Sequence, residues 1–306
     1  MMTTATATPA SSAARRTRQR RALGTAGNWL LLLPALALLV IVLGIPLVQS
    51  VIRSLGSPTS FTFDYYTSIF TQPAILRIML RTLIAALIVT AVTLVLGYPY
   101  AYLMTRVGST GRGIMLTVVL IPFWTSALAR NFAWIILLGN HAPVQQLFAF
   151  FGLKDVVLYG TASGVTLAMS QVMLPFMVLP LYASLGSIDR RLLLAARGLG
   201  SSPTRAFWKI FFPLSRTGVI SGMILVFTLS LGFYVTPALV GSPQQSLIAQ
   251  YLSVETTQLL DFASAGALGT FILIVTLLLV AWANRLGGSV AAIGAVANTN
   301  SNQGGR

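Results

Sequence analysis

The stretch Thr82–Thr105, TLIAALIVTAVTLVLGYPYAYLMT, is the part of the sequence that decides the fold. It contains no charged side chain, and it is longer than the roughly 20 apolar residues that a helix needs to cross the hydrocarbon core of a bilayer. In the whole chain of 306 residues, 56% are hydrophobic and 8% are charged, whereas soluble domains carry about 25% charged residues. The sequence therefore predicts an all-α membrane protein.

Five further stretches resemble the first in length and composition, which gives six predicted transmembrane helices. The predicted spans are residues 29–51, 82–105, 114–138, 160–185, 214–240 and 264–283. The first is too long for the apolar region of a signal peptide, which has about 7 to 15 residues, and we interpret it as an uncleaved span. Residues 1–27 and 286–306 lack the apolar residues needed for a core, so we predict disordered tails around a membrane domain of residues 28–285.

The basic residues that flank the spans predict the orientation of the chain. Fifteen of the twenty Lys and Arg residues lie on one face, in the two tails, the connection 106–113 and the segment 186–216, whereas four of the five acids lie on the other face. Because cytoplasmic loops are enriched in Lys and Arg, both termini are predicted to be cytoplasmic. A nucleic-acid-binding arm is the alternative for the N-terminal arginines, but the orientation signal accounts for them, and we expect the lipid bilayer and no nucleic acid as a partner.

The sequence lacks the motifs of common enzymes. There is no P-loop, no H-E-x-x-H and no G-x-S-x-G, and the chain has no Cys and a single His. We therefore predict no catalytic residue, no metal site and no cofactor bound by this chain. An ion-coupled secondary carrier or channel is the competing class, but no acid lies deep in a predicted span to form a proton relay. Energy for uphill transport would have to come from a partner protein.

The segment between the fourth and fifth spans, DRRLLLAARGLGSSPTRAFWKIFFP (residues 189–213), predicts two short helices joined by a tight turn. Asp189 suits the N-cap of the first helix and Gly200 the left-handed position that ends it. Ser202 suits the N-cap of the second helix, and Pro203 its first position. Small side chains beside the turn would allow another protein to approach closely. An amphipathic helix resting on anionic lipid is an equally good interpretation of the residues alone.

This segment also carries a family resemblance. Leu194-Ala-Ala-Arg-Gly-Leu-Gly200, followed nine residues later by Ile210-Phe-Phe-Pro213, resembles the signature E-A-A-x-x-x-G-x9-I-x-L-P of ABC importer permeases. Five other stretches are similar to permeases of the spermidine/putrescine (polyamine) branch. They are FTFDYY (61–66), GYPYAY (97–102), IPFWT (121–125), LPFMVLPLY (174–182) and FYVTPALVG (233–241).

The resemblance implies a type I ABC importer permease (MetI-like) fold in the bacterial cytoplasmic membrane. It implies a cytoplasmic ABC ATPase dimer that uses ATP and Mg, a second six-span permease and an extracytoplasmic solute-binding protein as partners. The segment 187–213 is then the coupling segment, which docks on the ATPase through Leu194, Ala195, Ala196, Gly200, Pro203, Arg205, Ile210 and Pro213. Leu194 departs from the glutamate of the signature, and Phe212 replaces its leucine.

Aromatic and polar residues inside the predicted spans are candidates for the translocation path or its gate. They are Phe123, Trp124, Arg130, Gln171, Tyr182, Phe233 and Tyr234. The aromatic rings could bind an ammonium group, and an interfacial aromatic belt is the alternative. Arg130 suits an anion better than a polycation, and we interpret it as a structural or gate residue that pairs with an acid of a partner. A polyamine is the predicted solute, with an opine, ferric iron or a sulfate-like oxyanion as alternatives.

Overall fold

The computed structural model describes residues 12–57, 60–139, 142–150, 152 and 157–301, and most of them are helical, as predicted. The helices are α1 (Ser12–Ser54), α2 (Asp64–Thr71), α3 (Pro73–Met104), α4 (Ser109–Trp124), α5 (Ala127–Leu138), α6 (Pro143–Phe150), α7 (Ala162–Gly186), α8 (Arg190–Gly198), α9 (Pro203–Ala206), the π-helix η1 (Phe207–Phe211), α10 (Phe212–Leu214), α11 (Arg216–Leu231), α12 (Val235–Val240), the 3-10 helix η2 (Pro243–Gln245), α13 (Ile248–Thr257) and α14 (Phe262–Ser301). A short antiparallel hairpin, β1 (Gly56–Ser57) and β2 (Ser60–Phe61), follows α1.

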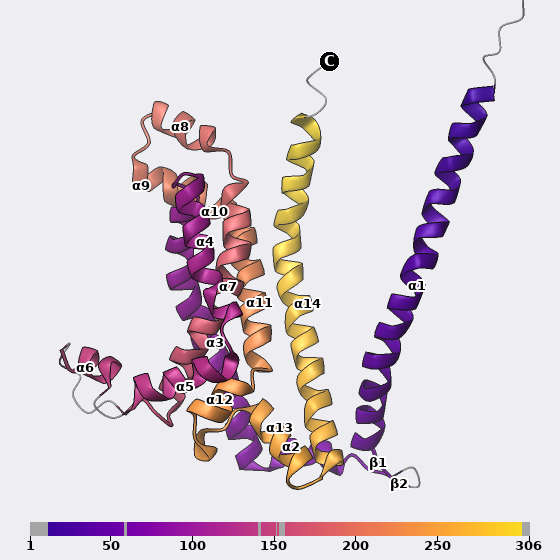
Figure 1. Cartoon of the computed structure of the whole chain (residues 1–306), viewed down its shortest axis with the longest axis vertical. Helices are drawn as coiled ribbons and strands as arrows, with labels where there is room; N and C mark the ends of the chain where they lie inside the picture. The colour runs from indigo at the N-terminus through magenta and orange to yellow at the C-terminus, as the bar shows by residue number, and fades with distance from the viewer. Residues whose placement is uncertain (1–11, 58–59, 140–141, 151, 153–156, 302–306) are drawn as a thin grey trace, which may run out of the picture.

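Helices α3, α7 and α11 form the central bundle (Figure 1). Val89, Met177 and Val226, one from each helix, are fully buried in it. Because lipid is as apolar as these side chains, close packing and not apolar burial holds such helices together in a membrane. Glycines on α11 permit that packing: a Cβ on Gly222 would lie 2.7 Å from the Sδ atom of Met177, and a Cβ on Gly218 would overlap a side chain of α7.

Helices α1 and α14 lie outside the central bundle (Figure 1). α14 contacts α11, and α1 contacts α14 near the hairpin end of the molecule, where a Cβ on Gly266 would lie 2.7 Å from the carbonyl oxygen of Ser50. No residue in the most apolar part of Leu33–Ser54 is buried. This exposed apolar surface suits the interior of a bilayer.

Up to six membrane spans are present among the described residues. Four helices are long and apolar enough to cross a membrane, namely α1 over Leu33–Ser54, α3, α7, and α14 over Phe262–Trp282. Two bent helix pairs bring the number to the predicted six if each pair is one span. They are α4 with α5, at 97°, and Pro203–Leu214 with α11, at 57°.

Two of the predicted spans are therefore not the single helices that the sequence indicates. Residues 114–138 divide at Thr125 and Ser126, whose ψ angles of 142° and 132° are extended and end α4. Residues 214–240 divide after Leu231, and a separate helix, α12, contains Pro237. Hydropathy records how apolar a segment is but not its direction, and both divided segments are predominantly apolar.

Other helix boundaries differ from the prediction because the helices are longer than the predicted spans. α3 begins at Pro73, before the predicted 82, because proline suits the first position of a helix. Helix α1 starts at Ser12 and α14 continues to Ser301, so the structure has helix over much of the tails 1–27 and 286–306 that we predict to be disordered. The remaining tail residues, 1–11 and 302–306, lie outside the described residues.

The two ends of the molecule carry different elements. The start of α1, the end of α14 and the helices α8 and α9 lie at one end, at the top of Figure 1, whereas the hairpin, α2, α12 and α13 lie at the other. The predicted coupling segment and both terminal helices therefore share one face. That this face is cytoplasmic stays a prediction from the distribution of basic residues.

Candidate functional site

The predicted coupling segment folds as two short helices with side-chain caps. The carboxylate of Asp189 accepts a hydrogen bond of 2.9 Å from the backbone N–H of Arg191 at the start of α8. The hydroxyl of Ser202 accepts one of 3.3 Å from the N–H of Arg205 at the start of α9, where Pro203 is the first helical residue. Each cap satisfies an N–H group that has no partner within its own helix, so the sequence fixes both helix starts.

Gly200 ends α8 in the left-handed conformation, with φ of +82°. Its N–H donates to the carbonyl of Arg197 at 2.9 Å, and the N–H of Ser201 donates to the carbonyl of Ala196 at 3.0 Å. This pair of bonds is the Schellman motif, which closes the end of a helix. A side chain at position 200 would meet no atom within 4 Å, so the backbone conformation, and not lack of space, favours glycine there.

The outer surface of the coupling segment is apolar with a basic rim. Leu194 and Leu199 are 65% and 90% exposed, and Ala195 is exposed between them. Arg197 and Arg205 are also exposed. Leu194 occupies the position of the glutamate in the permease signature. Because this position is exposed, a glutamate there would place its carboxylate on the outer surface of the coupling segment.

An aromatic cluster joins the coupling segment to the central bundle. The ring of Tyr102 on α3 lies 5.7 Å from that of Phe207 and 5.3 Å from that of Phe211, and the ring of Tyr98 lies 5.9 Å from that of Phe212. The Tyr98 hydroxyl also bonds to the hydroxyl of Ser215 at 2.9 Å. A displacement of α9 and η1 would therefore be transmitted to α3 through ring contacts.

This cluster is not among the features predicted from the sequence. One pattern in the sequence could indicate the cluster: Tyr98 and Tyr102 are four residues apart and therefore lie on one face of a helix. The predicted coupling residues Ile210 and Pro213 are half-buried within the same region, in η1 and α10, and do not lie on the exposed surface with Leu194.

A cavity of about 550 Å³, here called the corner cavity, lies where α4 turns into α5. Helices α4, α5, α7 and α11 line it through Pro122, Phe123, Thr125, Ala127, Arg130, Val172, Met173, Phe176, Leu229, Gly232 and Phe233. Three of the predicted path residues, Phe123, Arg130 and Phe233, are therefore brought together. Phe176, which is not among the predicted path residues, has its ring 5.1 Å from that of Phe123.

Arg130 holds the corner between α4 and α5. One of its guanidinium N–H groups donates to the carbonyl oxygen of Pro122 at 2.6 Å, and the hydroxyl of Thr125 donates to the same oxygen at 2.9 Å. This carbonyl belongs to the last turn of α4, where helical donors are missing and a positive charge is stabilised by the helix dipole. The Nε atom of Arg130 is buried and has no hydrogen-bond partner among the described residues.

Two of the other predicted path residues lie near the corner cavity without lining it. Trp124 is 88% exposed on the outside of the corner. Gln171 accepts a hydrogen bond of 3.1 Å from the indole N–H of Trp134, so its amide is used between α7 and α5. The exposure of Trp124 suits an interfacial aromatic residue, and Gln171 forms an interhelical hydrogen bond.

The remaining two predicted path residues lie in different parts of the molecule. Tyr182 accepts a hydrogen bond of 3.1 Å from Arg112, near the end that carries α8. Tyr234 accepts one of 3.4 Å from the hydroxyl of Ser253, in a hollow between α1, α13 and α14. Tyr182 is six residues beyond Phe176 on α7, about 9 Å along the helix at 1.5 Å per residue, which removes it from the corner cavity.

Two titratable groups outside the spanning segments have shifted pKa values. Burial raises the pKa of Tyr251 on α13 to about 12. The backbone N–H of Ser264 lowers the pKa of Asp261, whose carboxylate caps the start of α14 at 3.0 Å from that N–H. In the described part of the chain, no group of three or more His, Cys, Asp and Glu side chains could hold a metal ion.

The sequence and the fold are similar to those of known transport proteins. Residues 93–289 match the family described as binding-protein-dependent transport system inner membrane component. The chain is 34% identical over 231 residues to the spermidine/putrescine transport system permease protein PotB of Escherichia coli (strain K12), covering 74% of this chain and 84% of that protein. It is 29% identical over 286 residues to the inner membrane ABC transporter permease protein YdcU of the same organism, covering 83% and 91%.

A solved structure shares the fold. The crystal structure of a bacterial ABC transporter involved in the import of the acidic polysaccharide alginate contains a chain that is similar with a TM-score of 0.65 and 20% sequence identity. The similarity covers 89% of this chain and 99% of that one.

Proposed function

We propose that this chain, which belongs to the family of binding-protein-dependent transport system inner membrane components and is a permease subunit of an ABC importer, carries a polyamine across the bacterial inner membrane. The identity of 34% with a spermidine/putrescine permease over 84% of that relative supports the solute class. The observation that carries the proposal is the corner cavity, where the rings of Phe123, Phe176 and Phe233 gather at a break in the predicted third span.

The corner cavity is this chain's part of the translocation path. Aromatic faces attract an ammonium group by about 0.5 to 2 kcal/mol each, which is enough to guide a polyamine but not to trap it. Arg130 repels it: at about 8 Å and an effective dielectric constant of about 20, two like charges oppose each other by about 2 kcal/mol. Of the described residues that line the cavity, none is acidic. The carboxylates that a polycation needs therefore come from the second permease.

The coupling segment transmits work from a cytoplasmic ATPase dimer. The exposed apolar surface around Leu194, Ala195 and Leu199 docks in a groove of the ATPase, which uses ATP and Mg. Closure of the dimer moves α8 and α9, and the aromatic cluster passes this movement to α3. An extracytoplasmic solute-binding protein delivers the solute at the end that carries the hairpin, α12 and α13. Each access state is a minimum whose population ATP binding shifts.

A sulfate-like oxyanion is the second candidate solute, because one observation favours it. The guanidinium of Arg130 is on the wall of the corner cavity, and its buried Nε atom has no partner among the described residues. An oxyanion could accept a hydrogen bond from the Nε–H group of Arg130, whereas the ammonium groups of a polyamine could not.

Solute uptake by the reconstituted importer tests the proposal. The chain, its second permease, its ATPase and its solute-binding protein are placed in liposomes with ATP inside, and labelled putrescine, spermidine and sulfate are compared. ATP-dependent uptake of a polyamine and exclusion of sulfate is the expected result. Uptake of sulfate alone would show that the solute is an oxyanion and not a polyamine. Accumulation of solute by the chain without the ATPase would instead indicate an ion-coupled carrier.

A further inference from the structure

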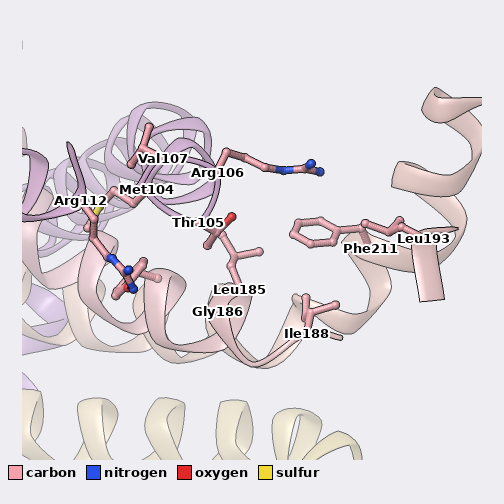
Figure 2. Close-up of a pocket in the computed structure, with 11 residues that line it drawn as sticks. Met104, Thr105, Arg106, Val107, Arg112, Leu185, Gly186, Ile188, Leu193 and Phe211 are labelled. Atoms are coloured by element: carbon pink, nitrogen blue, oxygen red, sulfur yellow. The ribbon is translucent and has the colours of Figure 1, made fainter. Parts of the chain in front are cut away.

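The two ends of the helix bundle differ in how their helices are joined. At the end that carries α8, a hollow of about 230 Å³ lies between the α3–α4 connection, the end of α7 and the coupling segment. Figure 2 shows the ring of Phe211 pointing across this hollow toward Leu185. At the opposite end, the connection between α12 and α13, residues 241–247, is hydrogen-bonded to both α3 and α7. We call this connection the strap.

Arg81 on α3 fastens one side of the strap. A guanidinium nitrogen of Arg81 donates to the carbonyl oxygen of Gln244 at 2.8 Å and to that of Ser246 at 3.4 Å. Carbonyl groups in a short turn lack partners within a regular helix, and a guanidinium offers several N–H donors in a fixed plane. Arg81 therefore sets the position of this turn relative to α3.

The start of α7 holds the other side of the strap through backbone N–H groups. The side-chain oxygen of Gln245 accepts a hydrogen bond from the N–H of Ala162, the first residue of α7. The N–H of Gly160 donates to the carbonyl oxygen of Val240, the last residue of α12, at 3.1 Å. N–H groups at the start of a helix have no partner within that helix, so the strap satisfies them. It thereby joins α7 to α3.

The strap has a buried end and an exposed part. Leu247 and Ile248 are 2% and 3% exposed, and the N–H of Ile248 donates to the hydroxyl of Thr82 at 3.0 Å. Gln244 is exposed, and so is its hydrogen bond with Arg81. Water can replace the partners of an exposed hydrogen bond, whereas separation of the buried end would expose apolar side chains and an unpaired N–H. The exposed part can therefore move away while the buried end stays in place.

One short helix connects the strap to the corner cavity. Gly232 and Phe233 line that cavity, α12 begins two residues after Phe233, and the strap follows α12. Val240 at the end of α12 is fully buried, and a Cβ on Gly241 would lie 3.2 Å from the side chain of Val165 on α7. Because a closely packed short helix moves as a unit, displacement of the strap shifts the cavity wall at Phe233.

We propose that the strap is a latch and that Arg81 is the positioning residue that keeps it closed. The closed latch holds α3 and α7 together at the end opposite the coupling segment. Work delivered at the coupling segment breaks the bonds of Arg81 and Gln245, and the buried end at Ile248 acts as the hinge. The inference rests on the proposed coupling to an ATPase, because alternating access requires the two ends of the path to open in turn.

Hydrogen exchange in the assembled importer tests the latch, because exchange reports the population of locally open states. The full-length chain, its second permease, its ATPase and its solute-binding protein are assembled in nanodiscs. Deuterium uptake is followed by mass spectrometry in peptides that contain Ala162, Ile248 and the coupling segment, without nucleotide and with a non-hydrolysable ATP analogue. The analogue should raise exchange at Ala162 by at least about tenfold and exchange at the hinge residue Ile248 by less than about twofold.

Substitution of Arg81 should open the latch without nucleotide. Arg81→Gln should raise exchange at Ala162 by about tenfold, because loss of a charge-assisted hydrogen bond shifts an equilibrium by at least about that factor. Arg81→Lys keeps the charge and an N–H donor and should restore most of the protection. The matched control, Arg77→Gln, removes the same charge from an exposed position about one turn earlier on α3 and should stay within about twofold of the natural protein.

The natural protein decides between a latch and a fixed brace without any variant. If the analogue changes exchange in the coupling segment but not at Ala162, the strap is a fixed brace and the proposal is overturned. If exchange changes in neither place, the proposed coupling to the ATPase is refuted, and the latch with it, because nothing then drives its opening. Equal exchange at Ala162 in Arg81→Gln, Arg77→Gln and the natural protein would show that Arg81 does not hold the strap, which also overturns the proposal.

Discussion

Replacement of Gly200 by alanine should weaken coupling to the ATPase through the backbone alone. A Cβ at this position has open space around it, so the change adds no contact within the chain. However, φ is +82°, and for an L-residue the left-handed conformation costs about 1 to 2 kcal/mol. This cost lowers the population of the closed turn about 5- to 30-fold. Solute-stimulated ATP hydrolysis by the assembled importer should fall to a similar degree at limiting ATPase concentration.

The neighbouring Gly198 provides the matched control. It is the last residue of α8, a Cβ there also has open space, and its φ is not in the left-handed region. Gly198→Ala should keep stimulation or increase it, since alanine favours a helix over glycine by up to about 1 kcal/mol. Gly200→Asn should lose less than Gly200→Ala, because asparagine tolerates the left-handed region. Equal stimulation by Gly198→Ala and Gly200→Ala would refute the role of the turn. An asparagine variant as defective as Gly200→Val would point to a contact with the ATPase instead.

Three further changes test the fold and the corner cavity. Gly218→Ala should destabilise the protein by about 1 to 3 kcal/mol, because it forces α11 away from α7, whereas Gly113→Ala, with open space, should not; thermal unfolding in detergent compares them. Arg130→Gln should lower the unfolding temperature, since a charge-assisted bond at the corner contributes about 1.5 to 3 kcal/mol; an unchanged unfolding temperature would show that Arg130 does not hold the corner. As pH rises from about 10 to about 12, the unfolding temperature should fall, because the pKa of Tyr251 is raised to about 12 and the unfolded chain releases this proton first; Tyr251→Phe should show a smaller fall.

The sequence predicts the parts of this protein that depend on neighbouring residues. Span 160–185 corresponds to α7, Ala162–Gly186, since hydropathy and length suffice for a straight helix. The Gly200 turn and the Ser202 cap are likewise local, because the groups that make each hydrogen bond are within a few residues of one another.

What the sequence does not predict depends on contacts between distant residues. The pairing of Tyr98 and Tyr102 with Phe207 joins positions more than one hundred residues apart, and nothing in either stretch indicates the other. Arg130 is identified as a candidate, but its hydrogen bond to Pro122 exists only because the chain turns between them. Tyr182 and Tyr234 are predicted to share the path with Phe123 only because all three are aromatic residues inside predicted spans. In the structure, the three rings line different cavities.

The right-angled corner after α4 leaves this helix too short to cross a bilayer by itself. The 16 residues of α4 rise about 24 Å, which is less than the roughly 30 Å of hydrocarbon, and α5 then turns away at 97°. We therefore expect the peptide groups at Thr125 and Ser126 to lie within the hydrocarbon region, where an amide without a protein partner needs water. Deuterium should therefore enter the backbone there sooner than in α7. Water that reaches these amides would also shorten the apolar distance that a charged solute has to travel.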